Sequence, residues 1–267
     1  GAIFIIEMKR SLALCLAFVG ISQVSCFGTE HYIWRVGGVS RRNISLLKYS
    51  TRTGIVPEVS EKDKGEIFQQ LGYIPSNLVS VAARRGGNLK TPLVLKTYPL
   101  NGGASRRKAK AEGSLTPFPT LFWFCCKDVG KAIADLERRG FVKRLEERLS
   151  EPGMLEQFVK CHDEYAKERW DSMSYEHQQY VSRNERMVRM LRDSGIAGTD
   201  YELFRSSQNP SIKCLHAHYG HYRSQIEKYS KQNGMDMDGK INNIEGINIV
   251  GLWIDELLRS EYPDLIL

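Results

Sequence analysis

The segment KCLHAHYGH at residues 213–221 brings together one thiol and three imidazoles, side chains that proteins use as zinc ligands and as nucleophiles or bases. At about 100° per residue in a helix, Cys214, His218 and His221 lie on one flank and His216 lies on the other. Cys214, His218 and His221 could bind zinc together. Cys214 and His221, however, are separated by two turns, about 10.5 Å along the axis, which is long for zinc bonds of about 2.0–2.3 Å. The segment therefore predicts either this metal site or a catalytic group completed from another element.

A further imidazole on a buried face precedes this segment. The helical pattern from residue 152 onward places His162 and Arg169 on its apolar stripe. Imidazole and cationic groups on a buried face are costly unless they are paired or functional. We therefore expect the two helices to bring these groups together, with His162, His216 and Cys214 as candidate catalytic residues.

An anion pocket is another interpretation of the same residues. In that pocket, Arg84, Arg169 and Lys213 would surround a phosphate or carboxylate together with His162 and His216. Histidine ionises nearest to neutral pH and would carry the proton in any reaction. A structural interpretation stays open beside it. In that case Lys213 and His216 bond to carbonyl groups, and His162 is a hydrogen-bonded interior imidazole.

Several β-rich runs and amphipathic segments must position these residues. The predicted strands are 78–85, 93–100 and 120–126. The predicted helices are 128–140, 152 onward, 174–194, 211 onward and one after the turn at 246–251. Asn248 stands where it could cap the last helix. The fold class is therefore α+β, with a small sheet of about three strands packed with several α-helices in a single domain over residues 61–267.

Residues 1–60 differ in composition from the rest of the chain. Met8-Lys9-Arg10 and the apolar run 11–24 are typical of a signal peptide, and residues 31–57 contain Arg, Lys, Ser and Thr but no acidic residue, as transit peptides do. This combination resembles the two-part plastid addresses of algae with complex plastids. We expect a targeting sequence and flexible linker over residues 1–60 and import into a plastid, with secretion or the endomembrane system as the alternative. The apolar run, if uncleaved, is the expected membrane contact.

The net charge of +7 is concentrated in two segments. Residues 1–60 carry +4 and residues 100–116 carry +3, so the rest of the chain is neutral. A nucleic-acid surface needs basic groups gathered on the folded body. Nucleic acid is therefore not an expected partner. Among the cysteines, the sequence leaves open a disulfide between Cys161 and Cys214 in an oxidising compartment.

Several short motifs resemble, in order, the bacterial domain-of-unknown-function 501 family, from roughly Gln70 to Gly251. They are AAR (82–84), TYP (97–99), PFPTLFW (117–123), LERRG (136–140), GIAG (195–198), IKCLHAHYGH (212–221) and GINIVG (246–251). The resemblance marks as candidate functional residues Arg84, Pro119, Thr120, His162, Lys213, Cys214, His216, His221, Asn248 and Gly251. Asn248 joins the candidate ligand-binding residues on this ground. The name of the family supplies no reaction.

The expected function is the binding of a small anionic molecule at a polar centre of His, Cys, Lys and Arg, with catalysis left open. Two alternatives remain: a non-enzymatic interaction module in an organelle process such as division, and a zinc-binding domain. A structure separates these possibilities. In the favoured case His162, His216, Lys213 and Arg84 converge on a pocket, and otherwise they are scattered through the packed core.

Overall fold

The computed structural model describes residues 58–86, 89–102, 115–207, 209–233 and 246–267. The targeting sequence expected over residues 1–60 lies almost wholly outside these ranges. All of the described residues fall within one compact unit, Tyr49–Leu267. Within these ranges, no helix is both long enough and apolar enough to span a bilayer.

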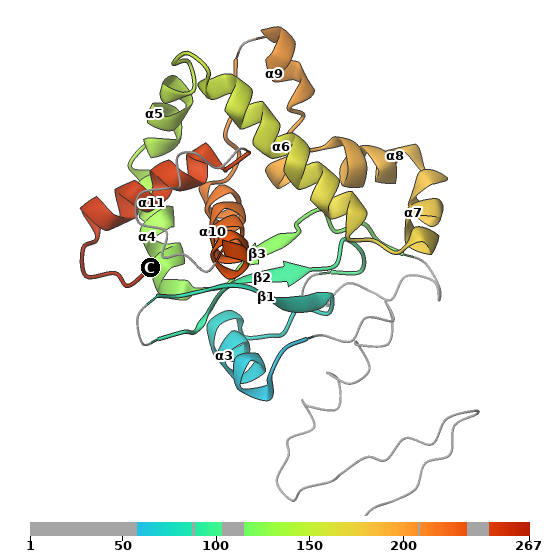
Figure 1. The fold of residues 1–267 in the computed structure, drawn as a ribbon, viewed down its shortest axis with the longest axis horizontal. Coiled ribbons are helices and arrows are strands. Elements are labelled where there is room, and N and C mark those ends of the chain that lie inside the picture. The colour runs from blue at the N-terminus through green and yellow to red at the C-terminus, as the bar shows by residue number, and fades with distance from the viewer. Residues whose placement is uncertain (1–57, 87–88, 103–114, 208, 234–245) are drawn as a thin grey trace, which may run out of the picture. The chain divides into compact units, whose positions relative to one another are not determined.

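An antiparallel sheet of three strands in the order β1-β2-β3 lies between α3 and α10 (Figure 1). The strands are β1 (Leu78–Arg84), β2 (Pro92–Thr97) and β3 (Phe122–Phe124). α3 (Glu61–Leu71) packs on one face of the sheet, and α10 (Leu215–Asn233) crosses the other. The middle strand is therefore covered on both faces, and its apolar residues run continuously instead of alternating. The expected α+β class with about three strands is confirmed.

The remaining helices follow β3, and the first and last of them pack directly against α10 (Figure 1). They are α4 (Lys127–Arg138), α5 (Phe141–Arg148), α6 (Met154–Asp171), α7 (Tyr175–Ser182), α8 (Glu185–Val188), α9 (Glu202–Ser207) and α11 (Ile249–Glu261). A π-helical turn, η1 (Arg189–Asp193), and a 3-10 turn, η2 (Ile196–Gly198), link α8 to α9. The largest apolar cluster joins the sheet to α4, α6, α10 and α11.

The helix predicted over residues 174–194 is interrupted at Asn184. The side chain of Asn184 accepts a hydrogen bond from the Met187 N–H and thereby caps α8. An Asn side chain that bonds the backbone in this way competes with helix continuation, which explains the break between α7 and α8. The helix predicted from residue 211 begins later, at Leu215, whose N–H has no partner within the helix and donates to the carboxylate of Glu137 in α4.

α10 and α11 pack closely because a glycine stands at their contact. A Cβ atom at Gly251 would lie 2.3 Å from Cβ of Tyr222 and 2.7 Å from the carbonyl oxygen of His218, both on α10. Asn248 caps α11 through a hydrogen bond from the Gly251 N–H, as the sequence predicts. This packing places Asn248 against the face of α10 that carries His218 and His221.

Candidate functional site

Three buried imidazoles form a cluster between α6 and α10. His162 of α6 and His218 of α10 are 0% exposed, and His221 is 1% exposed. The rings of His162 and His218 meet edge to face, with their centroids 5.4 Å apart. The two helices therefore do bring His162 into contact with the 213–221 segment.

Asn248 links two members of the cluster and fixes their tautomers. Its Oδ1 accepts from the Gly251 N–H, so the amide is oriented with Oδ1 toward His218 and Nδ2 toward His221. The His218 Nδ1–H must then donate to Oδ1 (3.2 Å), whereas His221 Nδ1 accepts from Nδ2 (3.2 Å). Neutral His221 therefore carries its proton on its Nε2 atom. Neutral His218 carries its proton on Nδ1 and has a lone pair on Nε2.

Two ring nitrogens of this cluster have no hydrogen-bond partner among the described residues, Nε2 of His162 and Nε2 of His218. Nδ1 of His162 accepts from the Ile196 N–H at 2.9 Å, so its proton is on Nε2. The unpartnered atoms are thus one donor and one acceptor on neighbouring rings.

Burial keeps all three imidazoles neutral. It lowers the pKa of His218 to about 4, against a smaller opposing effect of the Asn248 hydrogen bond. Burial and then the neighbouring His218 lower the pKa of His221 to about 3. The same two causes place the pKa of His162 well below its usual range. Near neutral pH none of the three is protonated, which does not favour a role as a general acid.

A cleft of about 460 Å³ opens between α6, α10 and the sheet, and His221 is part of its lining. The ring of Phe122 stacks on His221 with centroids 5.7 Å apart, and Tyr165 meets His221 edge to face. The lining residues are Ala82, Lys96, Phe122, Glu164, Lys167, Glu168, Asp171, His221, Ser224, Gln225 and Lys228. This volume falls within the range of small-molecule sites.

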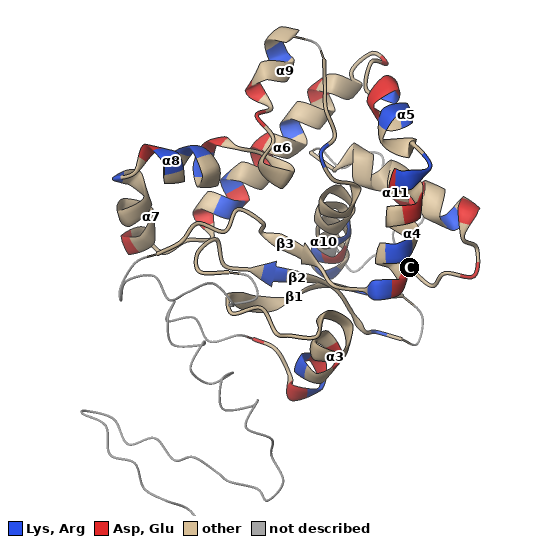
Figure 2. Cartoon of the chain, turned by 180° about the vertical axis from the view of Figure 1, so that it is seen from behind, with Lys and Arg blue, Asp and Glu red and all other residues tan. Residues whose placement is uncertain are grey.

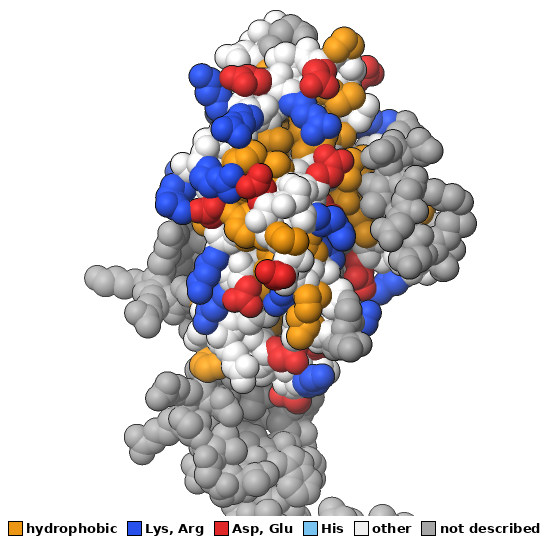
Figure 3. Space-filling model, turned by 90° about the vertical axis from the view of Figure 1, so that its left-hand side faces the viewer, with side chains coloured by type: hydrophobic (Ala, Val, Ile, Leu, Met, Phe, Trp, Pro, Cys, Tyr) orange, Lys and Arg blue, Asp and Glu red, His pale blue; other side chains and the backbone are white. Residues whose placement is uncertain are grey.

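The charged residues of the cleft were not among the sequence candidates. On a helix such as α6, glutamate and lysine side by side are typical of a solvated surface, and a single sequence gives no sign that a cleft lies beneath them. Lysine and arginine also alternate with acidic residues along α4, α6 and α8 (Figure 2), and the face in Figure 3 carries both signs interspersed. Such mixing lends no support to nucleic acid as a partner.

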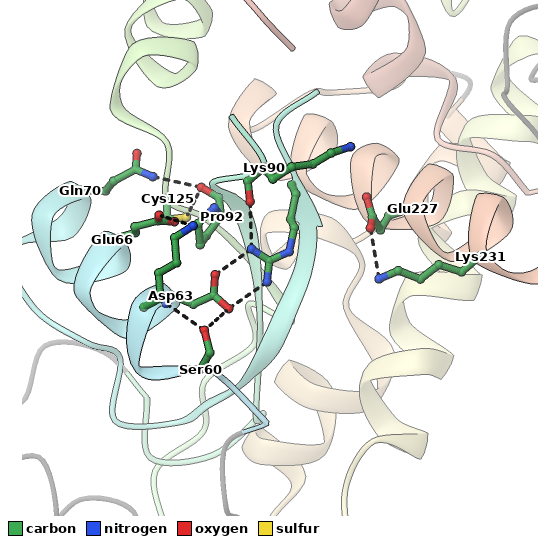
Figure 4. A network of polar contacts seen from close by, with 11 residues as sticks. Ser60, Asp63, Glu66, Gln70, Lys90, Pro92, Cys125, Glu227 and Lys231 are labelled. Atoms are coloured by element: carbon green, nitrogen blue, oxygen red, sulfur yellow. Dashed lines mark hydrogen bonds and ion pairs between the residues drawn. The ribbon is translucent and has the colours of Figure 1, made fainter. Parts of the chain in front are cut away.

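Arg84 does not approach the imidazoles. Its guanidinium forms two hydrogen bonds with the Asp63 carboxylate of α3, at 2.7 and 2.8 Å, and a third with the carbonyl oxygen of Lys90 (Figure 4). The bond to Arg84 lowers the pKa of Asp63, against the effect of burial. Arg84 therefore ties β1 to α3 on the face of the sheet opposite α10, and the expected convergence of Arg84 with His162 is wrong.

Arg169 is fully buried, and the backbone occupies its donors. It donates to the carbonyl oxygens of Leu191 (2.8 Å), Pro119 (3.1 Å), Gly195 (3.5 Å) and Ser194. These carbonyls belong to the end of η1, the following turn and the loop before β3. Arg169 thus fastens α6 to these segments and retains no donor for a ligand, contrary to the anion-pocket expectation.

Lys213 and His216 also bond to carbonyl oxygens, as the structural interpretation predicts. Lys213 is exposed and donates to the Gly198 oxygen at 2.8 Å. His216 Nε2 donates to the Gly130 oxygen of α4 at 3.0 Å, and its ring lies on the flank of α10 away from His221. The four groups expected to surround one pocket therefore occupy separate places.

At the start of α10, a carboxylate, a thiol and an imidazole lie close together. They belong to Glu137, Cys214 and His216, and their potential metal-ligand atoms all lie within 4.8 Å of one another. Partial burial lowers the pKa of His216, but hydrogen bonds to Cys214 and Gly130 and the charge of Glu137 outweigh it, so the pKa is raised. The metal set predicted from the sequence, Cys214 with His218 and His221, is not brought together. The two histidines bond Asn248 in the interior, whereas Cys214 faces α4.

The cysteines of the described part of the chain are free. The disulfide that the sequence left open between Cys161 and Cys214 is not formed. Cys125 and Cys161 are buried, and burial raises the pKa of both thiols. They are inert packing residues, and Cys214 is the partly exposed thiol among those described.

The fold and the cluster define an α+β domain built around buried, neutral imidazoles. A model of the family described as Protein of unknown function (DUF501) matches residues 84–233, more than half of the chain. The chain belongs to this family. The match includes His162, Cys214, His216 and His221 and ends before Asn248. No curated protein and no solved structure matches the chain.

Proposed function

We propose that this domain binds a small molecule with an anionic group in the cleft between α6, α10 and the sheet. The observation that carries the proposal is His221, a buried neutral imidazole that lines the cleft. Its Nδ1 is occupied by the Asn248 amide, so Nε2 carries a proton that can be donated to a ligand oxygen. A neutral donor held rigidly by a second side chain is typical of a site that orients a ligand.

The charges of the cleft indicate where an anion would lie. Lys96 pairs with Glu168 at 3.1 Å, and Lys167 pairs with Asp171 at 3.0 Å. Lys228 lines the cleft from the α10 side and has no ion pair within the described ranges. A carboxylate or phosphate lying between Lys228 and His221, which are about two turns apart along α10, would gain a charge-assisted hydrogen bond that the free protein does not make.

The acidic groups of α6 select the rest of the ligand. Glu164, Glu168 and Asp171 line the opposite wall of the cleft. Glu168 and Asp171 are paired with Lys96 and Lys167, so this wall carries little net charge but offers carboxylate oxygens that accept hydrogen bonds. We therefore infer a compact ligand with one anionic group toward α10 and hydroxyl or amine groups toward α6.

Thermal-shift and calorimetric titrations test this function with three probes: inorganic phosphate, acetate and methylammonium. Phosphate or acetate should raise the melting temperature, and methylammonium should not. Lys228→Met should weaken anion binding about tenfold, the loss of one charge-assisted hydrogen bond of roughly 1.5 kcal/mol. Lys231→Met is the matched control, because Lys231 lies on the same helix, pairs with Glu227 and is not part of the lining.

Three results would contradict the proposal. The first is that neither anion shifts the melting temperature at millimolar concentration. The second is that Lys228→Met and Lys231→Met weaken binding equally, since this would point to a general attraction of anions by α10. Equal shifts with methylammonium and phosphate would likewise show that the cleft does not select an anion.

A further inference from the structure

A second candidate site lies on the other flank of α10, at its first turn. Glu137 comes from the last turn of α4, Cys214 directly precedes α10, and His216 is the second residue of α10. Their carboxylate, thiol and ring nitrogen atoms all lie within 4.8 Å of one another. Residues far apart in the sequence are thus brought together by the packing of α4 against α10.

The spacing of these atoms suits a tetrahedral ion. Zinc bonds of about 2.0 Å to nitrogen or oxygen and 2.3 Å to sulfur place neighbouring ligand atoms roughly 3.3–3.6 Å apart. Glu137 Oε1 and His216 Nδ1 already lie 3.4 Å apart. These two atoms are already at the spacing of zinc ligands, and Cys214 Sγ, which lies within 4.8 Å of both, would approach when an ion binds. A thiolate, an imidazole and a carboxylate together are a donor set that zinc accepts.

The orientation of His216 supports a ligand role independently of the distances. A carbonyl oxygen can only accept, so His216 Nε2 must donate its proton to the Gly130 oxygen, 3.0 Å away. In the neutral ring this leaves the lone pair on Nδ1, the atom that faces Glu137. Histidines that bind metals characteristically donate their other ring N–H to a backbone carbonyl or a carboxylate, which fixes the tautomer and the ring orientation.

Glu137 is also held in place. Its Oε1 accepts the Leu215 N–H at 2.9 Å, so the carboxylate is fixed at the start of α10. The side chains of His216 and Glu137 are 29% and 32% exposed, and Cys214 is also partly exposed. A fourth coordination position would therefore be open to solvent, as in zinc sites with three protein ligands and one exchangeable water.

We propose that Glu137, Cys214 and His216 bind one Zn²⁺ ion through the carboxylate, the thiolate and Nδ1, with the fourth position open to water or a small ligand. Cys214 loses its proton to solvent when the ion binds. The cleft lined by His221 and Lys228 shares no residue with this site. Each proposal can therefore be tested independently of the other.

Titration of the full chain with Co²⁺, after removal of metal by a chelator, tests the site. A cobalt ion bound by a thiolate gives a sulfur-to-metal charge-transfer band in the near ultraviolet, so we expect this band to saturate at one ion per chain. Competition with Zn²⁺ should abolish it. Cys214→Ser should remove the band, and Glu137→Gln should weaken binding at least tenfold. The amide oxygen of Gln can still accept the Leu215 N–H, which keeps α10 in place.

Cys126→Ala is the matched control, because Cys126 is a buried free cysteine outside the cluster, at the start of α4. Its charge-transfer band and stoichiometry should equal those of the wild type. The proposal is overturned if folded wild-type protein gives no charge-transfer band with Co²⁺. It is equally overturned if Cys214→Ser, folded as judged by circular dichroism, keeps the band, since another thiol would then be the ligand.

Discussion

Acidification from pH 7.5 to 5.0 should destabilise this domain strongly, because its three buried histidines cannot be protonated in place. Burial lowers the pKa of His218 to about 4 and of His221 to about 3, and places that of His162 well below its usual range. In the unfolded chain each would have a pKa of about 6.5. The unfolded state therefore binds more protons throughout this interval, and the free energy of unfolding falls as the pH falls below 6.5.

The magnitude follows from proton uptake by the unfolded chain. At pH 5.0, a histidine with an unfolded pKa of about 6.5 that stays neutral in the fold lowers the free energy of unfolding by about 2 kcal/mol. The three contributions add, because in the unfolded chain these side chains titrate independently, which gives about 6 kcal/mol. A typical domain has a free energy of unfolding of roughly 5–15 kcal/mol, so the protein should be close to unfolding at pH 5.

Urea unfolding followed by circular dichroism at half-unit steps between pH 7.5 and 5.0 measures this loss. The slope near pH 5.5 should correspond to the uptake of about three protons, and His162→Gln should reduce the total loss by about 2 kcal/mol. The amide oxygen of Gln can accept the Ile196 N–H that His162 accepts. A slope of less than one proton would contradict this prediction, because it would mean that these imidazoles are charged or accessible to solvent in the folded state.

Three substitutions test other parts of the structure by urea unfolding at pH 7.5. Arg169→Met should lower the free energy of unfolding by about 3 kcal/mol, since it leaves several buried carbonyl oxygens without donors. Gly195→Ala should cost about 2–3 kcal/mol, because its Cβ would lie 2.2 Å from Nδ1 of His162. Gly65→Ala, with nothing within 4 Å, is its control and should be neutral or stabilising. Asn248→Ala should cost about 2–4 kcal/mol, since both the cap of α11 and the links to two imidazoles are lost. An effect below 1 kcal/mol for Arg169→Met, Gly195→Ala or Asn248→Ala would contradict the contact assigned to that residue.

Helical periodicity was sufficient to predict the meeting of α6 and α10. A residue on the apolar stripe of a helix faces the core, and two core-facing helices in a small domain have few other places to pack. The two helices do meet, but His162 contacts His218, which the helical pattern placed on a flank of the second helix, and not His216 as expected. Periodicity also placed Asn248 at the start of α11. These features depend on the spacing of residues along one helix, and a single sequence is enough to determine that spacing.

The partners of the charged groups could not be predicted in the same way. Arg84 was expected beside His162, but its strand lies between two layers of helices, and the sequence does not indicate which layer the side chain faces. It faces α3, where Asp63 neutralises it. Glu137 was seen in the LERRG motif but not as a neighbour of Cys214, because that contact depends on how α4 packs against α10. Tertiary packing, which is not encoded in local spacing, decides such pairs.

α10 carries its imidazoles into two environments, and the difference between them decides which kind of chemistry each flank can support. On the inner flank, burial and a single amide leave His218 and His221 neutral, so they can orient a ligand but cannot readily gain charge. On the outer flank, His216 lies beside a carboxylate and a thiol and is partly exposed, so a positive charge or an ion is favoured there. Because Co²⁺ binding and anion binding report on opposite flanks, Cys214→Ser should leave anion affinity unchanged, and Lys228→Met should leave the cobalt spectrum unchanged. Coupling between the two measurements would require a change in the packing of α10 itself.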